Sequence, residues 1–132
     1  MAASEGPLKG VKVLDLSRIL AGPTCTQLLG DLGASVIKIE NPATGGDDTR
    51  QWGPPYVEDA DGNRSDLSAY FMAANRNKKS VAIDITTAKG QAEIKRLASY
   101  ADILIENFKP GGLAKYGLDY VSLSQELPGL VY

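Results

Sequence analysis

The chain has 132 residues, 43% of them hydrophobic and 23% charged, with a formal net charge of -2. This length suits one domain with one core, and the charge gives no reason to expect nucleic acid or an anionic membrane as the main partner. With no histidine and a single cysteine, the chain contains no Ser-His or Cys-His pair, no His-ligated metal site and no internal disulfide. One cysteine suits a reducing compartment, so we expect a cytoplasmic protein, or in a eukaryote one of the mitochondrial matrix or peroxisome.

Five short apolar runs predict strands that are buried by helices on both faces, because they are rich in Val, Ile and Leu. Segments with helical patterning lie between most of them, and the clearest carries Ile94, Leu97 and Ala98 at the spacing of one buried stripe. The expected strands are 11–16, 35–40, 80–85, 102–108 and 130–132, and the expected helices are 24–32, 68–75, 87–101 and 121–127.

Strands that alternate with helices indicate parallel pairing with right-handed crossovers. We therefore predict an α/β fold: a Rossmann-like, doubly wound, mainly parallel sheet of about five strands in the order 3-2-1-4-5. Residues 41–66 are dense in Gly, Pro and Asp and are expected to form a long loop, of which residues 45–55 contact either substrate or a partner subunit. The run at 130–132 resembles a strand cut off as it starts, so residues 1–132 are expected to be the N-terminal part of a larger domain.

The order of elements between residues 11 and 40 is that of a dinucleotide-binding unit, but its first loop is SRILAGPT and lacks the motif G-x-G-x-x-G. Ligands of such sheets bind at the carboxyl ends of the strands, where the strand order reverses. This edge is expected to gather a mixture of amide, aromatic, ammonium and backbone groups, which suits a long, amphipathic, phosphorylated ligand. The residues placed there are Leu20, Ala21, Asn41, Thr86, Asn107, Phe108 and Lys109.

Two lysines, Lys109 and Lys115, surround a Pro-Gly-Gly turn that is expected to open the next helix. Backbone amides at a helix start, together with two ammonium groups, are suited to holding phosphates. The alternative is a polar turn with solvated lysines.

Four segments of the sequence resemble the N-terminal part of the class III coenzyme A transferases, the family of formyl-CoA transferase, the carnitine CoA-transferases and α-methylacyl-CoA racemase. These segments are GVKVLDLSRILAGPTCTQLLGDLGASVIKIE, GGDDTRQWGPP, NRNKKSVAID and ADILIENFKPGGLAKYGLDY. The second is most similar to the branch that moves CoA from succinyl-CoA to other dicarboxylates. The resemblance implies that acyl-CoA and a small carboxylic acid are the substrates, without a metal. A racemase of the same fold and a stand-alone nucleotide-binding module are the alternatives.

The resemblance also implies where CoA is bound. It places the thioester end near the start of the first helix, the adenine beside the second and third strands, and the pantetheine and phosphates after the fourth strand. The implied cofactor-binding residues are Leu20, Ala21, Asn41, Ile83, Asp84, Ile85, Thr86, Asn107, Phe108, Lys109 and Lys115.

The nucleophile implied by the family is an aspartate beyond Tyr132, which attacks the acyl-CoA to give a mixed anhydride and then an aspartyl-CoA thioester. No catalytic residue is therefore assigned within the chain, and the chain alone is expected to be inactive. The family also implies that the full-length protein is an interlocked homodimer.

Several other residues have simple structural interpretations. Cys25, Tyr70 and Phe71 are expected in the core, while Asp15 and Asp31 are expected to accept structural hydrogen bonds. Glu40 is either a ribose ligand or a structural residue. Residues 75–80 precede the third strand, so they are expected at the opposite end of the sheet from the ligand, in a turn or a subunit interface.

Overall fold

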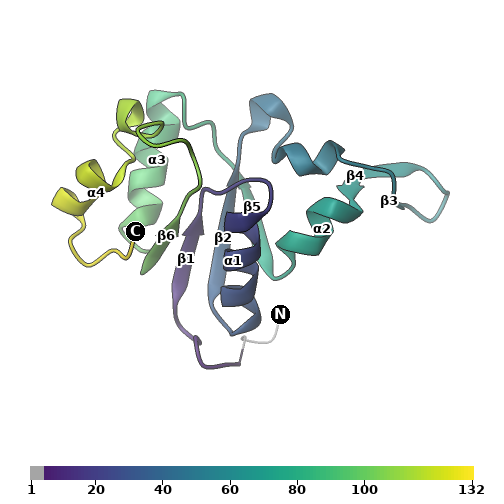
Figure 1. Ribbon diagram of the computed structural model, residues 1–132, viewed down its shortest axis with the longest axis horizontal. Helices are drawn as coiled ribbons and strands as arrows, with labels where there is room; N and C mark the ends of the chain where they lie inside the picture. The colour runs from purple at the N-terminus through teal and green to yellow at the C-terminus, as the bar shows by residue number, and fades with distance from the viewer. Residues whose placement is uncertain (1–4) are drawn as a thin grey trace.

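The computed structural model describes residues 5–132, and its centre is a four-stranded parallel sheet in the order β5-β2-β1-β6 (Figure 1). The strands are β1 (Lys12–Asp15), β2 (Ser35–Glu40), β5 (Lys78–Ala82) and β6 (Ile103–Ile105). This confirms the predicted order for the first four strands. The fifth is reduced to one parallel bridge between Val131 and Ile103, beside β6.

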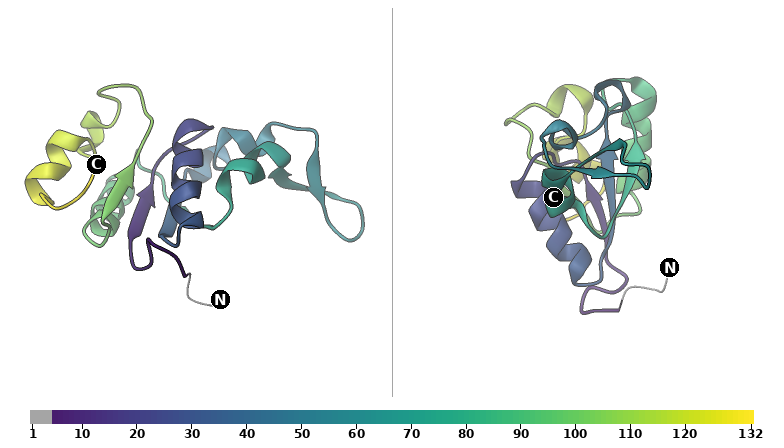
Figure 2. Two further views of the ribbon diagram at one scale, coloured as in Figure 1. Left: turned by 60° about the horizontal axis from the view of Figure 1, so that its bottom comes forward. Right: turned by 90° about the vertical axis from the view of Figure 1, so that its right-hand side faces the viewer.

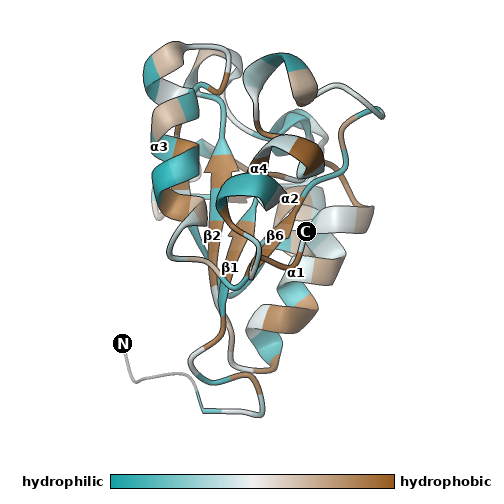
Figure 3. Ribbon diagram, turned by 90° about the vertical axis from the view of Figure 1, so that its left-hand side faces the viewer, coloured by the Kyte–Doolittle hydropathy of each residue, from teal (hydrophilic) through white to brown (hydrophobic). Residues whose placement is uncertain are grey.

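Helices cover both faces of the sheet because neighbouring residues of a strand point to opposite sides. Val13 and Val36 pack beneath α1 (Ala21–Asp31), whereas Leu14 packs with Ile94 of α3 (Ala88–Ala98). Figure 3 shows the apolar strands enclosed between these two helices. Leu123 of α4 (Tyr120–Glu126) joins the α3 side of the core.

The residues at the start of two helices explain where these helices begin. Helix α1 starts three residues earlier than predicted, since Pro23 lies in its first turn, where the missing N–H of proline costs nothing. Helix α3 is capped by the Thr87 hydroxyl, which accepts the Gly90 N–H at 3.0 Å. None of the helices within residues 5–132 is long and apolar enough to cross a membrane.

The long loop predicted for residues 41–66 contains short elements of its own. These are two 3-10 turns, η1 (Pro42–Thr44) and η2 (Asp48–Gln51), and an antiparallel hairpin of β3 (Tyr56–Glu58) and β4 (Arg64–Ser68). Figure 2 shows this hairpin extending away from the sheet. Ser68 then caps the short helix α2 (Ala69–Asn75) by accepting the Phe71 N–H.

Two of the expected core residues are exposed. Cys25 faces solvent and Tyr70 is 37% exposed, whereas Phe71 is buried as predicted, beneath the Arg50 guanidinium at 3.9 Å. The expectation for Cys25 is wrong because the buried side of α1 is made largely of small and polar residues, and Cys25 and Leu28 lie on its outer side, whereas Leu29 packs against the core. The buried residues of α1 are Gly22, Pro23, Thr26, Gln27 and Gly30.

Candidate functional site

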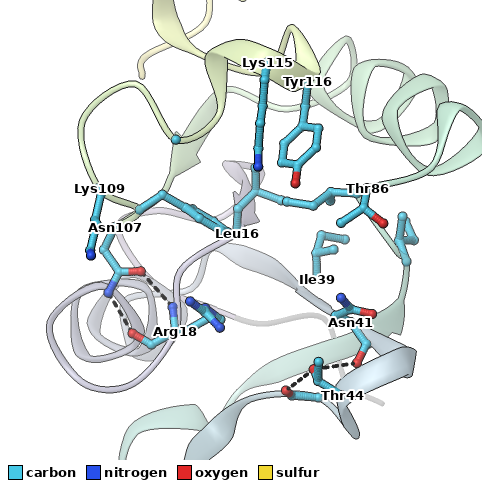
Figure 4. A pocket seen from close by; sticks show the side chains of 15 residues that line it. Leu16, Arg18, Ile39, Asn41, Thr44, Thr86, Asn107, Lys109, Lys115 and Tyr116 are labelled. Atoms are coloured by element: carbon cyan, nitrogen blue, oxygen red, sulfur yellow. Dashed lines mark hydrogen bonds between the residues drawn. The ribbon is translucent and has the colours of Figure 1, made fainter.

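A cavity of about 560 Å³ lies at the carboxyl ends of the four parallel strands (Figure 4). Each strand contributes residues that follow it: Arg18 after β1, Asn41 after β2, then Ile83, Ile85 and Thr86 after β5, and residues 107–109 after β6. The short helix η3 (Ala114–Tyr116) contributes two more side chains. The cavity therefore occupies the sheet edge that the strand order predicts for a ligand.

The cavity combines an apolar floor with a cationic rim. Aliphatic side chains of Leu16, Ile39 and Ile83 line it, and Figure 4 shows Lys115 extending into it beside the Tyr116 hydroxyl. No aspartate or glutamate is present among the described residues that line it. This arrangement suits a ligand with a flat or apolar part and negatively charged groups.

Most of the residues predicted from the sequence meet at this cavity. Leu20 and Ala21 do not: they lie at the start of α1, and both are exposed. Asp84 does not line the cavity either. Its carboxylate accepts the Thr86 N–H at 2.9 Å and the Thr86 hydroxyl at 2.7 Å. These bonds hold the pKa of Asp84 below its ordinary value. The predicted residues that do line the cavity are Asn41, Ile83, Ile85, Thr86, Asn107, Phe108, Lys109 and Lys115.

Sequence reasoning missed several lining residues, of which Arg18 and Tyr116 are the most polar. Each stands next to a recognised feature: Arg18 is in the loop after the first strand, and Tyr116 follows Lys115. Their position beside these features could have indicated that they line the cavity. The other missed residues are Leu16, Ile39, Thr44, Gly46 and Gly112.

Asn107 fixes the two loops on either side of the reversal in strand order. Its Nδ2 donates to the Arg18 carbonyl at 2.7 Å, and its Oδ1 accepts the Arg18 N–H at 2.9 Å (Figure 4). The Arg18 guanidinium in turn lies 5.4 Å from the centre of the Phe108 ring and 3.5 Å from the Asp48 carboxylate. The Asn107 amide thus holds Arg18 at the cavity before any ligand binds.

The Pro-Gly-Gly turn does not open a helix, which corrects the sequence prediction. Gly111 has a left-handed φ of 76° and Gly112 N–H bonds to the Lys109 carbonyl at 2.8 Å, so the chain turns and enters only the 3-10 helix η3. Helix α4 begins later, at Tyr120. This segment therefore offers no helix start to the cavity, and its cationic groups there are Lys109 and Lys115.

Beneath the cavity, buried charges are paired as expected for structural groups. The Asp15 carboxylate, fully buried, accepts the Ser17 N–H at 2.9 Å, the hydroxyls of Ser17 and Thr26, and the Lys78 ammonium at 3.2 Å. Burial lowers the pKa of Lys78, and the Asp15 charge opposes this shift only in part. This confirms the structural interpretation of Asp15.

Glu40 also has a structural role. Its carboxylate accepts two bonds from Arg50, at 2.8 and 2.7 Å, together with the Asp47 N–H at 2.9 Å and the Ser80 hydroxyl at 2.7 Å. Burial by itself raises the pKa of Glu40, but these donors outweigh it and hold the pKa below its ordinary value. With both carboxylate oxygens occupied, Glu40 does not serve as a ribose ligand in this arrangement.

Residues 75–80 lead from the end of α2 into β5 and do not line the cavity. Arg76 and Asn77 both donate to the Asp31 carboxylate near the end of α1, which confirms the structural role of Asp31. Lys78 instead points inward, where it bonds to the Pro23 carbonyl at 2.8 Å and to Asp15. Of the two roles predicted for this segment, a turn or a subunit interface, the structure shows the turn.

Comparison with known proteins decides the family. The model of CoA-transferase family III matches residues 8–132. The chain belongs to CoA-transferase family III. The family expected from the sequence motifs is thereby confirmed.

The relatives of this family III chain are much longer than it is. A succinate–glutarate CoA-transferase of Agrobacterium fabrum is 56% identical over all of the chain, which covers 32% of that protein. A succinyl-CoA:glutarate CoA-transferase of Mus musculus is 48% identical over 98% of the chain, covering 28% of the relative. A crystal structure of a CAIB/BAIF family protein from Brucella suis has a TM-score of 0.83 and 54% identity, over 91% of the chain and 30% of that protein. The chain thus spans about a third of its relatives.

Proposed function

We propose that this chain forms the CoA-binding part of an enzyme that transfers CoA between succinyl-CoA and a small dicarboxylic acid such as glutarate. The observation that carries the proposal is the cavity at the carboxyl edge of the sheet, with an apolar floor and Arg18, Lys109 and Lys115 around it. CoA has the matching chemistry, since it joins a flat adenine and an apolar chain to phosphate groups. The names of the relatives support the dicarboxylate branch.

In the proposed arrangement the adenine lies against the side chains that follow β2 and β5, including Ile39, Ile83 and Ile85. The phosphates lie toward Lys115 and Lys109, whose ammonium groups form charge-assisted bonds with them. The pantetheine passes Phe108 and Arg18 toward Leu20 and Ala21. A Rossmann-type sheet without the glycine-rich loop is then explained, because the phosphates are held by lysines on the far side of the reversal.

The proposed chemistry uses a carboxylate outside this chain. An aspartate oxygen attacks the thioester carbonyl and releases CoA thiolate, which then opens the resulting anhydride to an aspartyl-CoA thioester and the free acid. The acceptor carboxylate next attacks the aspartyl-CoA thioester and releases CoA thiolate, which then attacks the acceptor's acyl carbonyl in the second mixed anhydride to give the new CoA thioester and the free aspartate. We further propose that the full-length enzyme is a homodimer and that it works in a reducing compartment, which is the cytoplasm or, in a eukaryote, the mitochondrial matrix or peroxisome.

Replacing Lys115 by alanine is expected to weaken CoA binding about tenfold, equivalent to about 1.4 kcal/mol. Dephospho-CoA, which lacks the 3′-phosphate, should lose much less affinity, because the missing ammonium group is expected to contact that phosphate. Calorimetric titration of both ligands measures the difference.

The matched control is Lys9→Ala, which removes an exposed lysine that does not line the cavity. It should leave both affinities unchanged. Equal weakening of CoA and dephospho-CoA by Lys115→Ala would show that Lys115 does not contact the 3′-phosphate.

A further inference from the structure

The loop that leads from β1 to α1 contains a strained backbone position. Ile19 has a φ of 74°, in the left-handed region that a β-branched residue rarely occupies. It stands between Arg18, which lines the cavity, and Leu20, which precedes α1. Such a conformation persists only where surrounding groups enforce it.

Asp47 and Lys38 enforce this conformation from below. The Ile19 N–H donates to the Asp47 carboxylate, at 3.3 and 3.2 Å from its two oxygens. The Lys38 ammonium bonds to Asp47 Oδ2 and to the Ser17 carbonyl, both at 2.9 Å. The pair therefore holds the chain on both sides of Arg18.

The pair is enclosed, and Asp47 is itself held in place. The Lys38 and Asp47 side chains are 1% and 0% exposed, and neither lines the cavity. Asp47 also accepts the Thr49 N–H at 3.0 Å and the Thr49 hydroxyl at 2.8 Å. A buried ion pair of this kind contributes little stability compared with apolar packing of equal volume. The geometry of the pair is better explained by its bonds to the Ile19 N–H and the Ser17 carbonyl.

We infer that Asp47, held by Lys38, is a positioning residue for the cavity: it fixes the left-handed backbone of Ile19 and so places Arg18 over Phe108. The consequence for CoA affinity rests on the proposed function, whereas the consequence for the loop does not. The inference adds Asp47 and Lys38 to the residues on which ligand binding depends, although neither contacts the cavity.

The test replaces Asp47 by asparagine, which keeps one acceptor oxygen but puts an NH2 group in place of the other and removes the negative charge that pairs with Lys38, so Ile19 N–H and Lys38 can no longer both bond as they do to Asp47 Oδ2. Amide hydrogen exchange at Ile19 should become at least about tenfold faster, corresponding to 1.4 kcal/mol, and the NMR signature of its positive φ should be lost. The CoA dissociation constant should rise about tenfold.

The matched control is Gln27→Ala, which removes the Gln27 amide bonds to Ala73 and Arg76. It weakens the packing of α1 on α2 without touching the loop, so Ile19 exchange and CoA affinity should stay within about twofold of the wild type, because these sites share no partners. Adding Ile19→Gly to Asp47→Asn should restore CoA affinity, since glycine adopts a positive φ without strain. A role confined to general stability predicts no such rescue.

If Asp47→Asn does not fold, Thr49→Val replaces it, because this change removes only one donor to Asp47 and should accelerate Ile19 exchange to a smaller extent. Unchanged exchange and an unchanged positive φ at Ile19 in the folded variant would overturn the inference. If wild-type chain fails to bind CoA, the proposed function is refuted, and the Ile19 measurements alone decide the positioning role.

Discussion

Replacing Gly22 by alanine is expected to destabilise the fold by about 3 kcal/mol, the upper part of the range for overpacking. A Cβ at this position would lie 2.2 Å from the Ser17 Cβ and 2.4 Å from its Oγ. Ser17 cannot move aside, because it is buried and its N–H and hydroxyl both bond to Asp15. The clash outweighs the gain of about 1 kcal/mol that alanine brings to a helix.

The measurement is urea unfolding of the wild-type chain and the variant, with Gly129→Ala as the matched control. An added Cβ at Gly129 meets no atom within 4 Å, so that change should stay within about 0.5 kcal/mol of the wild type. A Gly22→Ala variant as stable as the control would show that α1 does not pack this closely on the loop. Gly22 is thus explained by the approach of α1 to Ser17, not by binding of a phosphate.

The 132-residue chain alone is expected to transfer no CoA from succinyl-CoA to glutarate above the rate of the protein-free mixture. The proposed mechanism needs a carboxylate at the thioester carbonyl, and no aspartate or glutamate is among the described residues that line the cavity. The buried carboxylates of Asp15, Glu40 and Asp47 are each occupied by several donors. None is free to act as a nucleophile.

Mass spectrometry of the CoA thioesters after incubation with both substrates measures this transfer. The full-length protein serves as the positive control, and it is expected to turn over at a rate ordinary for enzymes, about 10 per second. Turnover by the chain alone at about 1 per second or faster would mean that one of its own carboxylates is the nucleophile.

The sheet order and the position of the cavity could be predicted because they follow from local patterns. Apolar runs that alternate with helices determine a parallel sheet, and the reversal of strand order then determines the edge where ligands bind. Thr86 and residues 107–109 lie at this edge as the strand order predicts, whereas Ile83 and Ile85, which also line the cavity, were expected only from the family resemblance.

The remaining features depend on contacts between residues distant in the sequence. The buried face of helix α1 consists largely of small and polar residues that pack against buried charged groups. The hydrophobic pattern therefore predicted the wrong face of α1 as buried, and Cys25 is exposed. The hairpin of β3 and β4 escaped prediction because its composition is that of a loop, and Arg64 stacks on Tyr56 at 3.5 Å only after folding. Nothing local indicates that Lys38, inside a strand, reaches Asp47.

The most direct test of the central claim is calorimetric titration of the wild-type chain with CoA and, separately, with NAD. Both ligands contain an adenosine diphosphate part, but only CoA carries the 3′-phosphate and the pantetheine chain that the lysines and Phe108 are proposed to contact. We expect CoA to bind at the cavity more tightly than NAD. Equal or tighter binding of NAD, or no binding of CoA, would contradict the assignment of this cavity to CoA.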